Sequence, residues 1–389
     1  MGAAMATDRS LGSPAKHVDT RGRRDRRRSS KTKTERWSLT RIAAQLVPEQ
    51  RVAHCFWTPT GVGSSVDVLI RNGEARFQGL QTCGSVWACP VCGARINEVR
   101  RQELHQLQRW ARSRGYVVLL LTLTARHHEG MNLSWLLAAM RDAKRALRQS
   151  RSWRALREDE GGSLRGAVTA LEVTIGDAGW HPHFHELLIL ECEDEASGMA
   201  LVEGLRAEWL RSLDKKGLSG AGAAFDVRGG SQASRYVAKF GEDEAVIEEE
   251  GEASVSSYGL PEEMTMSRVK RGRRGGRSPM QLLRDAKEGD EEAGRLWAVY
   301  ARAFRGKQQL TWSNGLKAAA GVGEVEDEQA AAPEAFDEEE DEVVVCIPIP
   351  VWKHMRHHYR VEILEAAEDG GAEAVHRLLW LHAMPPPDG

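Results

Sequence analysis

Three histidines stand at alternate positions in one apolar stretch, at His181, His183 and His185. Residues 180–190 favour a β-strand, because aromatic and branched aliphatic residues are frequent there and no helical period fits them. Side chains alternate between the two faces of a strand, so all three imidazoles project from the same face. A single histidine on a strand is more often a core or surface residue. Three at alternate positions favour a metal site.

A carboxylate is expected on the same face. The stretch 165–175 also has the composition of a strand, and a Gly-Asp-Ala-Gly turn joins it to the histidine strand. If Ile175 pairs with Trp180 across this turn, Glu172 lies opposite His183. A slip of one residue in this register would move Glu172 to the other face.

Such a hairpin would supply three ligands to one divalent ion and leave open positions on it. The predicted ligands are Glu172, His183 and His185, with His181 as an additional candidate. An ion held in this way can polarise a phosphoryl oxygen and orient the phosphorus for in-line attack. Imidazole tolerates Mn²⁺, and Mg²⁺ serves where phosphate and water complete its shell, so the expected ion is Mg²⁺ or Mn²⁺.

A second predicted site is rich in cysteine. Cys89 and Cys92 are two residues apart in a Cys-Pro-Val-Cys-Gly turn, which lets both thiolates reach one tetrahedral Zn²⁺. Cys83 would supply a third ligand, and Cys55 or His54 a fourth. The alternative is a set of buried free thiols. Four protein ligands would close the site, so this zinc is expected to be structural. The isolated Cys192 and Cys346 are expected to be core residues.

A tyrosine and a lysine provide the third candidate site. Residues 232–240 favour a short helix, in which Tyr236 and Lys239 are neighbours on one face. A phenolate can attack a phosphodiester and form a phosphotyrosine ester. Its ordinary pKa is about 10, and a lysine one turn away can lower that pKa or stabilise the developing charge. Taken alone, the pair is also compatible with a packed tyrosine and a solvated lysine.

The surrounding elements alternate between helices and strands. Helices are expected over 94–113, 131–150 and 195–213, and strands over 116–124 and 224–227. The apolar strand 116–124 fits the centre of a sheet covered on both faces. Two more helices are expected over 278–307. The predicted fold class is therefore α+β, a central antiparallel sheet with flanking helices and a small zinc-binding subdomain.

Charge is nearly balanced overall but strongly segregated along the chain. The 389 residues include 54 Lys and Arg and 56 Asp and Glu. Basic residues dominate 21–36, and acidic residues dominate 324–342. No apolar run reaches the ~18 residues of a membrane span, and the N-terminus has no apolar signal core. Clustered cysteines favour a reducing compartment and a metal site over a disulfide scaffold. These features predict a cytoplasmic protein without a membrane partner.

The order of these motifs resembles that of the HUH endonucleases, and it is most similar to rolling-circle replication initiators of small bacterial plasmids. Residues 117–124 would be the family's first motif, His183-Phe184-His185 the metal-binding second and Tyr236-Val237-Ala238-Lys239 the third. The cysteine block and Trp312-Ser313 also look like the corresponding motifs of that family's members. The resemblance implies a palm-like sheet and nicking of one strand at a replication origin. A 5′-phosphotyrosine link and a 3′-OH primer would result.

The resemblance also implies partners and a domain plan. The partners would be origin DNA at a single-stranded or cruciform nick site, and a host helicase and polymerase. The expected segments are a disordered basic tail (1–45), a zinc-binding block and helix (46–114), an HUH nuclease domain with a helical C-terminal extension (115–316), an acidic linker (317–342) and a small strand–helix tail (343–389).

One position departs from part of the family. Some relatives have a second tyrosine four residues after the first, where this chain has Phe240. Tyr236 is then the single nucleophile of this motif, and Glu242 or Glu244 is a candidate for the terminating step. Three alternatives stay open: an HUH-type transposase, a relaxase, and a non-catalytic zinc-containing DNA-binding protein.

Overall fold

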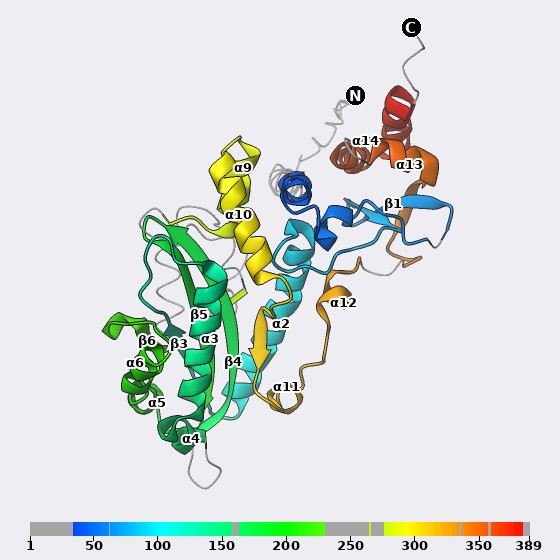
Figure 1. Cartoon of the computed structure of the whole chain (residues 1–389). Coiled ribbons are helices and arrows are strands. Elements are labelled where there is room, and N and C mark those ends of the chain that lie inside the picture. Colours follow the sequence, from blue (N-terminus) through cyan, green and yellow to red (C-terminus); the bar gives the residue numbers. More distant parts are fainter. Residues whose placement is uncertain are drawn as a thin grey trace, which may run out of the picture.

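The computed structural model describes residues 34–61, 63–157, 163–229, 264–265, 276–333, 337–356 and 359–383. Within these ranges the strands form two sheets, and every pairing between them is antiparallel. Helices flank both sheets (Figure 1). The α+β fold class expected from the sequence is therefore confirmed.

The larger sheet has five strands in the order β6-β3-β5-β4-β7. Its longest pair is the hairpin β4–β5, whose two strands are joined by a two-residue turn. Strand β3 is an interior strand between β6 and β5, and its apolar side chains are covered on both faces, as its continuous apolar run predicts. The strands are β3 (Val117–Leu123), β4 (Leu164–Gly176), β5 (Gly179–Leu190), β6 (Phe225–Gly229) and β7 (Leu310–Trp312).

Each face of this sheet has its own core. Leu188 and Leu190 of β5 belong to the core that α3 completes, whereas Leu187 and Ile189 belong to the core that α2 completes. Helix α3 lies along one face in Figure 1. The helices around this sheet are α2 (Pro90–Ser113), α3 (Leu133–Gln149), α4 (Arg151–Arg157), α5 (Glu195–Glu203) and α6 (Arg206–Asp214), with the short η2 (Gly222–Ala224) before β6.

Helix α3 is held to its face by a buried ionic cluster. Glu186 of β5 is fully buried, and its Oε1 lies 3.1 Å from Lys144 Nζ and 3.0 Å from Arg148 Nη2. Thr169 of β4 donates to the same oxygen at 3.1 Å. These contacts fix β4 and β5 relative to α3, and the histidine face of β5 points the other way.

The smaller sheet joins segments from the two ends of the described chain. Its order is β2-β1-β8, so the strand near residue 345 pairs with the strand near residue 68. A helix spans residues 34–46, so residues 34–45, expected within a disordered tail, are helical. Cys346, expected in the core, is exposed. The elements of this unit are η1 (Arg51–His54), β1 (Ser65–Arg71), β2 (Glu74–Gln78), β8 (Glu342–Pro348), α13 (Ile349–Met355) and α14 (Arg360–Ala383), which is interrupted at Gly371.

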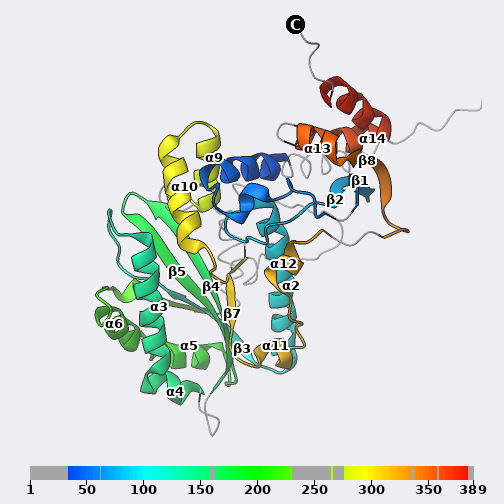
Figure 2. The ribbon, with the colours of Figure 1, turned by 45° about the vertical axis from the view of Figure 1, so that its right-hand side comes forward.

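Helix α2 connects the two sheets. Its first turn lies in the cysteine block, and Leu104, Leu107 and Ala111 near its other end pack on the five-stranded sheet. Figure 2 shows α2 extending between the two units. The two helices expected over 278–307 are confirmed as α9 (Pro279–Lys287) and α10 (Glu291–Phe304). Within the stretch expected as an acidic linker, α12 (Asp327–Ala331) packs against α2; α11 (Leu316–Ala319) precedes it.

None of the helices in the described ranges combines the length and the apolarity required to cross a bilayer.

Candidate metal centres and active site

The hairpin β4–β5 brings a carboxylate to two imidazoles at the middle of the large sheet. Ile175 pairs with Trp180 and Glu172 pairs with His183, which confirms the register expected from the sequence. Oε2 of Glu172 lies 3.0 Å from Nε2 of His183 and 3.0 Å from Nε2 of His185. The ligand atoms of these three side chains all lie within 4.8 Å of one another, a spacing that a single metal ion can bridge.

The turn of the hairpin explains this register. Gly176 pairs with Gly179, so Asp177 and Ala178 form a two-residue turn between the strands. Gly179 has φ +86°, a conformation that glycine adopts without strain. A Cβ atom at Gly179 would also lie 2.9 Å from the carbonyl oxygen of His128. The turn therefore requires glycine, and the loop after β3 packs against it.

Both imidazoles are oriented by contacts of their Nδ1 atoms. Nδ1 of His183 lies 3.2 Å from the carbonyl oxygen of His181, and Nδ1 of His185 lies 3.1 Å from Oγ1 of Thr122 on β3. A carbonyl oxygen only accepts, so His183 has a proton on Nδ1, and its Nε2 has a lone pair unless the ring is doubly protonated. A lone pair and a carboxylate oxygen at 3.0 Å require a cation between them. Either a second proton or a divalent ion would satisfy the site, so the residues fit a metal centre.

Burial strengthens the need for a cation between Glu172 and the two imidazoles. Glu172 is 8% exposed and His185 is 6% exposed, so solvent screens their charges little. Burial raises the pKa of Glu172, but the facing imidazoles of His183 and His185, when protonated, outweigh burial and hold that pKa well below its ordinary value. A positive charge among the three side chains thus keeps the carboxylate ionised, and an ionised carboxylate is an anionic metal ligand.

Two further histidines, His181 and His127, lie in a row with the rings of His183 and His185. His181 lies next to His183 with ring centroids 5.3 Å apart, and it stacks on His127 with centroids 4.5 Å apart and 18° between the ring planes. Burial, and then the neighbouring His183 and His127, lower the pKa of His181 to about 4. His181 is thus neutral at physiological pH, and it lies beside the three-ligand group rather than within it.

The four cysteines expected to bind zinc converge in the smaller unit. Sγ of Cys55 lies 3.6 Å from Sγ of Cys89 and 3.4 Å from Sγ of Cys92, and Sγ of Cys83 lies 3.7 Å from Sγ of Cys92. Zn–S bonds of about 2.3 Å in a tetrahedron place sulfurs about 3.8 Å apart, so these spacings fit Zn²⁺. Cys55 belongs to the cluster and the neighbouring His54 is exposed.

Local sequence explains how the cysteine turn forms. Cys89 is the N-cap of α2, and its sulfur accepts from the backbone N–H of Cys92. Pro90 occupies the first helical turn, where its missing N–H has no cost. Neighbouring thiols, Cys83 first, and then burial raise the pKa of Cys55 well above its ordinary value. Four thiolates can therefore coexist here only with a cation among them.

A buried and a half-buried arginine, Arg360 and Arg95, flank the cluster without any carboxylate. Arg360 of α14 donates to the carbonyl oxygens of Cys55 and Phe56 at 3.2 and 3.3 Å, and it is 5% exposed. Arg95 of α2 donates to the carbonyl oxygen of Ala331 at 3.1 Å. Among the described residues, neither guanidinium has an acidic side chain within ion-pair distance. Burial lowers the pKa of Arg360 to about 10, and the charges of Cys55 and Cys89 oppose that shift.

The charges of this arrangement match those of a zinc site. A divalent ion with four thiolates carries a net double negative charge, and the guanidinium groups of Arg95 and Arg360 carry the opposite charge. Charges removed from water are stable when they are paired, and an anionic metal cluster would provide the partner for both arginines.

The predicted nucleophile and its helper lie outside the described residues. Tyr236 and Lys239 fall in the range 230–263, as do Phe240, Glu242 and Glu244. Their distance from the histidines therefore stays a prediction.

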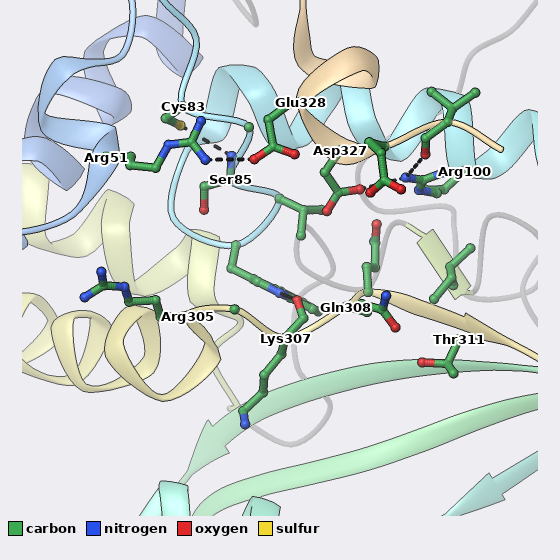
Figure 3. A pocket seen from close by; sticks show the side chains of 18 of the residues that line it. Arg51, Cys83, Ser85, Arg100, Arg305, Lys307, Gln308, Thr311, Asp327 and Glu328 are labelled. Atoms are coloured by element: carbon green, nitrogen blue, oxygen red, sulfur yellow. Dashed lines mark hydrogen bonds and ion pairs between the residues drawn. The ribbon is translucent and has the colours of Figure 1, made fainter.

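A cavity of about 560 Å³ lies between α2, the α10–β7 connection and the acidic stretch before α12. Ion pairs cross its wall, with Arg51 2.7 Å from Glu328 and Arg100 2.7 Å from Asp327, as Figure 3 shows. Glu172, His183 and His185 do not line it. Acidic side chains pair with Arg51, Arg100 and Lys317 of its lining, and the ligand triad lies elsewhere, so we assign the chemistry to the hairpin and not to this cavity.

Comparison with known proteins adds evidence independent of this geometry. Residues 74–197 match the family model described as replication protein. The matched segment contains the hairpin triad and the cysteines at positions 83, 89 and 92. The resemblance to replication proteins expected from the motif order is confirmed.

Two curated relatives extend this comparison. The chain is 27% identical over 304 residues to Protein rep of Streptomyces lividans, and the match covers 64% of this chain and 66% of the relative. It is 31% identical over 142 residues to a neomycin resistance protein of Streptomyces cyanogenus, covering 30% and 32% of the two chains. The chain thus spans just under two thirds of the first relative and about a third of the second. No solved structure matches the chain.

Three contributors to these sites were not identified from the sequence. Thr122 is a polar residue within the apolar strand β3 and pairs directly with His185, so its position in the strand was a usable signal. His127 and Arg360 had no comparable signal, because their partners lie 54 and about 305 residues away in the chain.

Proposed function

We propose that this protein is a plasmid rolling-circle replication initiator that nicks one DNA strand at the origin. The observation that carries the proposal is the convergence of Glu172, His183 and His185 inside a segment that matches replication proteins. A buried carboxylate facing two imidazoles fits a divalent cation, and such a cation assists phosphodiester chemistry by polarising a phosphoryl oxygen.

Each residue of the triad has a distinct task. Glu172 supplies the anionic ligand, and His183 and His185 supply Nε2 atoms whose direction is set through Nδ1. Together they would hold Mg²⁺ or Mn²⁺. When bound, the ion supplies Lewis-acid polarisation of a phosphoryl oxygen of the scissile group. Thr122 keeps the His185 ring in place, so the ligands are arranged before the substrate arrives.

Tyr236 is the proposed nucleophile. Its phenolic oxygen would form a bond to phosphorus as the bond from phosphorus to the 3′ oxygen breaks. The phenolic proton leaves, and the departing 3′ oxygen gains a proton, which yields a 5′-phosphotyrosine ester and a 3′-OH primer. Lys239 would stabilise the phenolate. Glu242 or Glu244 is proposed for the terminating step, because Phe240 cannot attack.

The cysteine block would hold a structural Zn²⁺ through Cys55, Cys83, Cys89 and Cys92. Its effect on the nuclease is positional: it fixes the first turn of α2, and α2 packs on the sheet that carries the triad. The proposed partners are origin DNA, single-stranded or extruded as a cruciform at the nick site, and the host helicase and polymerase that act after nicking.

Covalent attachment tests this function. The full chain is incubated with a single-stranded origin oligonucleotide and Mn²⁺ and is then run on a denaturing gel. A slower-migrating band is expected for the wild type, none after chelation, and none for Tyr236→Phe. Tyr359→Phe, a tyrosine in the smaller unit stacked on His382, is the matched control and should keep the band.

Two results would contradict the proposal. An adduct that persists in Tyr236→Phe would remove the nucleophile assignment. Duplex binding that survives chelation, with no strand cut under any metal condition, would instead identify a non-catalytic zinc-containing DNA-binding protein.

A further inference from the structure

The stacked pair His127 and His181 extends the metal site toward the surface. His127 lies in the loop after β3, and its ring is nearly parallel to that of His181 at a centroid distance of 4.5 Å. His181 lies 5.3 Å from His183, and His183 lies 4.9 Å from His185. Four rings thus form a row from a partly exposed loop residue to the buried centre of the sheet.

The loop that carries His127 is held in position. Arg126 donates its backbone N–H to the carbonyl oxygen of Ser219 at 2.8 Å, and Met131 donates to the carbonyl oxygen of His128 at 3.3 Å. The same carbonyl approaches Gly179 so closely that a side chain there would clash. These backbone contacts hold the loop against the hairpin, which keeps His127 within stacking distance of His181.

Neither ring belongs to the metal-ligand group. The triad is complete with Glu172, His183 and His185, and the outer two histidines add no ligand atom to it. Among the described residues, no other aromatic ring stacks on His127, and its side chain is partly exposed. A planar ring that is supported on one face and partly exposed has the geometry on which an unpaired nucleobase stacks.

We propose that His127, backed by His181, is a stacking platform for one nucleobase of the single-stranded substrate, next to the scissile phosphate at the metal site. This inference rests on the proposed function and names the position that orients the strand. Stacking accepts any base, because every base has a π face, so the platform positions the strand without reading its sequence. Arg126, exposed beside His127, is available to the adjoining phosphate.

Binding to single strands with and without bases tests the platform. Affinity of the full chain for a thymidine 20-mer is compared with affinity for a 20-mer of abasic deoxyribose phosphate, by fluorescence anisotropy in the absence of divalent ion. His127→Ala should weaken binding of the thymidine strand about tenfold, since stacking contributes ~1–3 kcal/mol per base, and leave abasic binding unchanged. His127→Phe should restore the wild-type affinity.

The neighbouring His128 provides the matched control. It is exposed, its Nδ1 contacts the carbonyl oxygen of Glu129, and His128→Ala should bind both strands like the wild type. Equal loss on both strands for His127→Ala would overturn the platform, because a merely structural role does not depend on bases. The platform would also be overturned if His127→Ala bound the thymidine strand as tightly as the wild type does.

Failure of the platform is distinguishable from failure of the proposed function. If the wild type forms the covalent adduct while His127→Ala binds normally, the nickase stands and the platform is wrong. If base-dependent binding is lost in His127→Ala but the wild type forms no adduct, the platform stands as a single-strand binding site and the nickase is wrong.

Discussion

Glu172 lies directly opposite His183 in the β4–β5 ladder, and its Oε2 atom is 3.0 Å from Nε2 of that histidine. Because Nδ1 of His183 contacts a carbonyl oxygen, the atom facing Glu172 has a lone pair unless the ring is doubly protonated. The contact is thus stable only with a proton or a metal ion between the two atoms. The strand register therefore predicts metal binding, which can be measured.

Removing the charge of Glu172 should weaken divalent-ion binding while preserving the hairpin. We expect Glu172→Gln to lower Mn²⁺ affinity at least about tenfold. Loss of a residue that only hydrogen-bonds to a metal ligand already lowers metal affinity by about 10–100-fold, and Glu172 is a ligand itself. Electron paramagnetic resonance of free Mn²⁺ measures this directly. Glu191→Gln, an exposed glutamate just after β5 paired with Arg165, should bind like the wild type. Unchanged affinity in Glu172→Gln would contradict the assignment of the site.

Thr122 should act on the ion only through His185. Replacement by valine keeps the shape and β-propensity of the side chain and removes the oxygen that lies 3.1 Å from Nδ1. A loss of Mn²⁺ affinity of roughly tenfold is expected, with little change in thermal unfolding. Thr124→Val, just past the end of the same strand, is the control. Equal effects in the two variants would show that β3 is perturbed generally.

Zinc content should depend on the clustered cysteines alone. Cys89→Ser removes a thiolate from the four-sulfur cluster and the N-cap of α2, so bound zinc should be lost and the melting temperature should fall. Cys346→Ser changes an exposed cysteine outside the cluster and should retain one zinc per chain. Atomic absorption on the purified proteins measures both. Retention of zinc by Cys89→Ser would rule out the predicted ligand set.

Arg360 should stabilise the fold only while the cluster is anionic. With metal bound, Arg360→Met should lower the free energy of unfolding by about 3 kcal/mol, because removing one member of a buried charge group leaves the other uncompensated. After chelation the difference from the wild type should shrink. Arg377→Met on the same helix, an exposed residue paired with Glu373, should have little effect in either state. A metal-independent loss in Arg360→Met would indicate packing instead.

Asp341 should make the smaller unit sensitive to acid. Arg71 first, and then Arg76, hold the pKa of Asp341 well below its ordinary 3.8, against the effect of burial. A carboxylate with a depressed folded pKa stabilises the fold above the unfolded pKa; this contribution declines as the pH falls below 3.8 and is lost as the pH falls through the lower folded pKa. The free energy of unfolding, measured with urea, should therefore fall less between pH 5 and pH 2.5 in Asp341→Asn than in the wild type. Glu340→Gln, which is more exposed, should behave like the wild type.

Local patterns in the chain were sufficient to predict the hairpin triad. The alternation of His181, His183 and His185 determines their common face, and the Gly-Asp-Ala-Gly turn determines the register that brings Glu172 to His183. Both depend on geometry within about twenty residues, where strand period and turn type leave few options. The Cys-x-x-Cys turn at the start of α2 is predictable for the same reason.

Contacts between distant segments were decided only by the tertiary structure. The pairing of β8 with β1, the insertion of Arg360 beside Cys55 and the stacking of His127 on His181 join parts of the chain that no local period relates. Such contacts form because the whole chain buries its apolar surface and pairs its buried charges at once, and the free energy of that packing is not a property of any short stretch. Residue types thus determined which chemistry is available, and packing decided which residues share it.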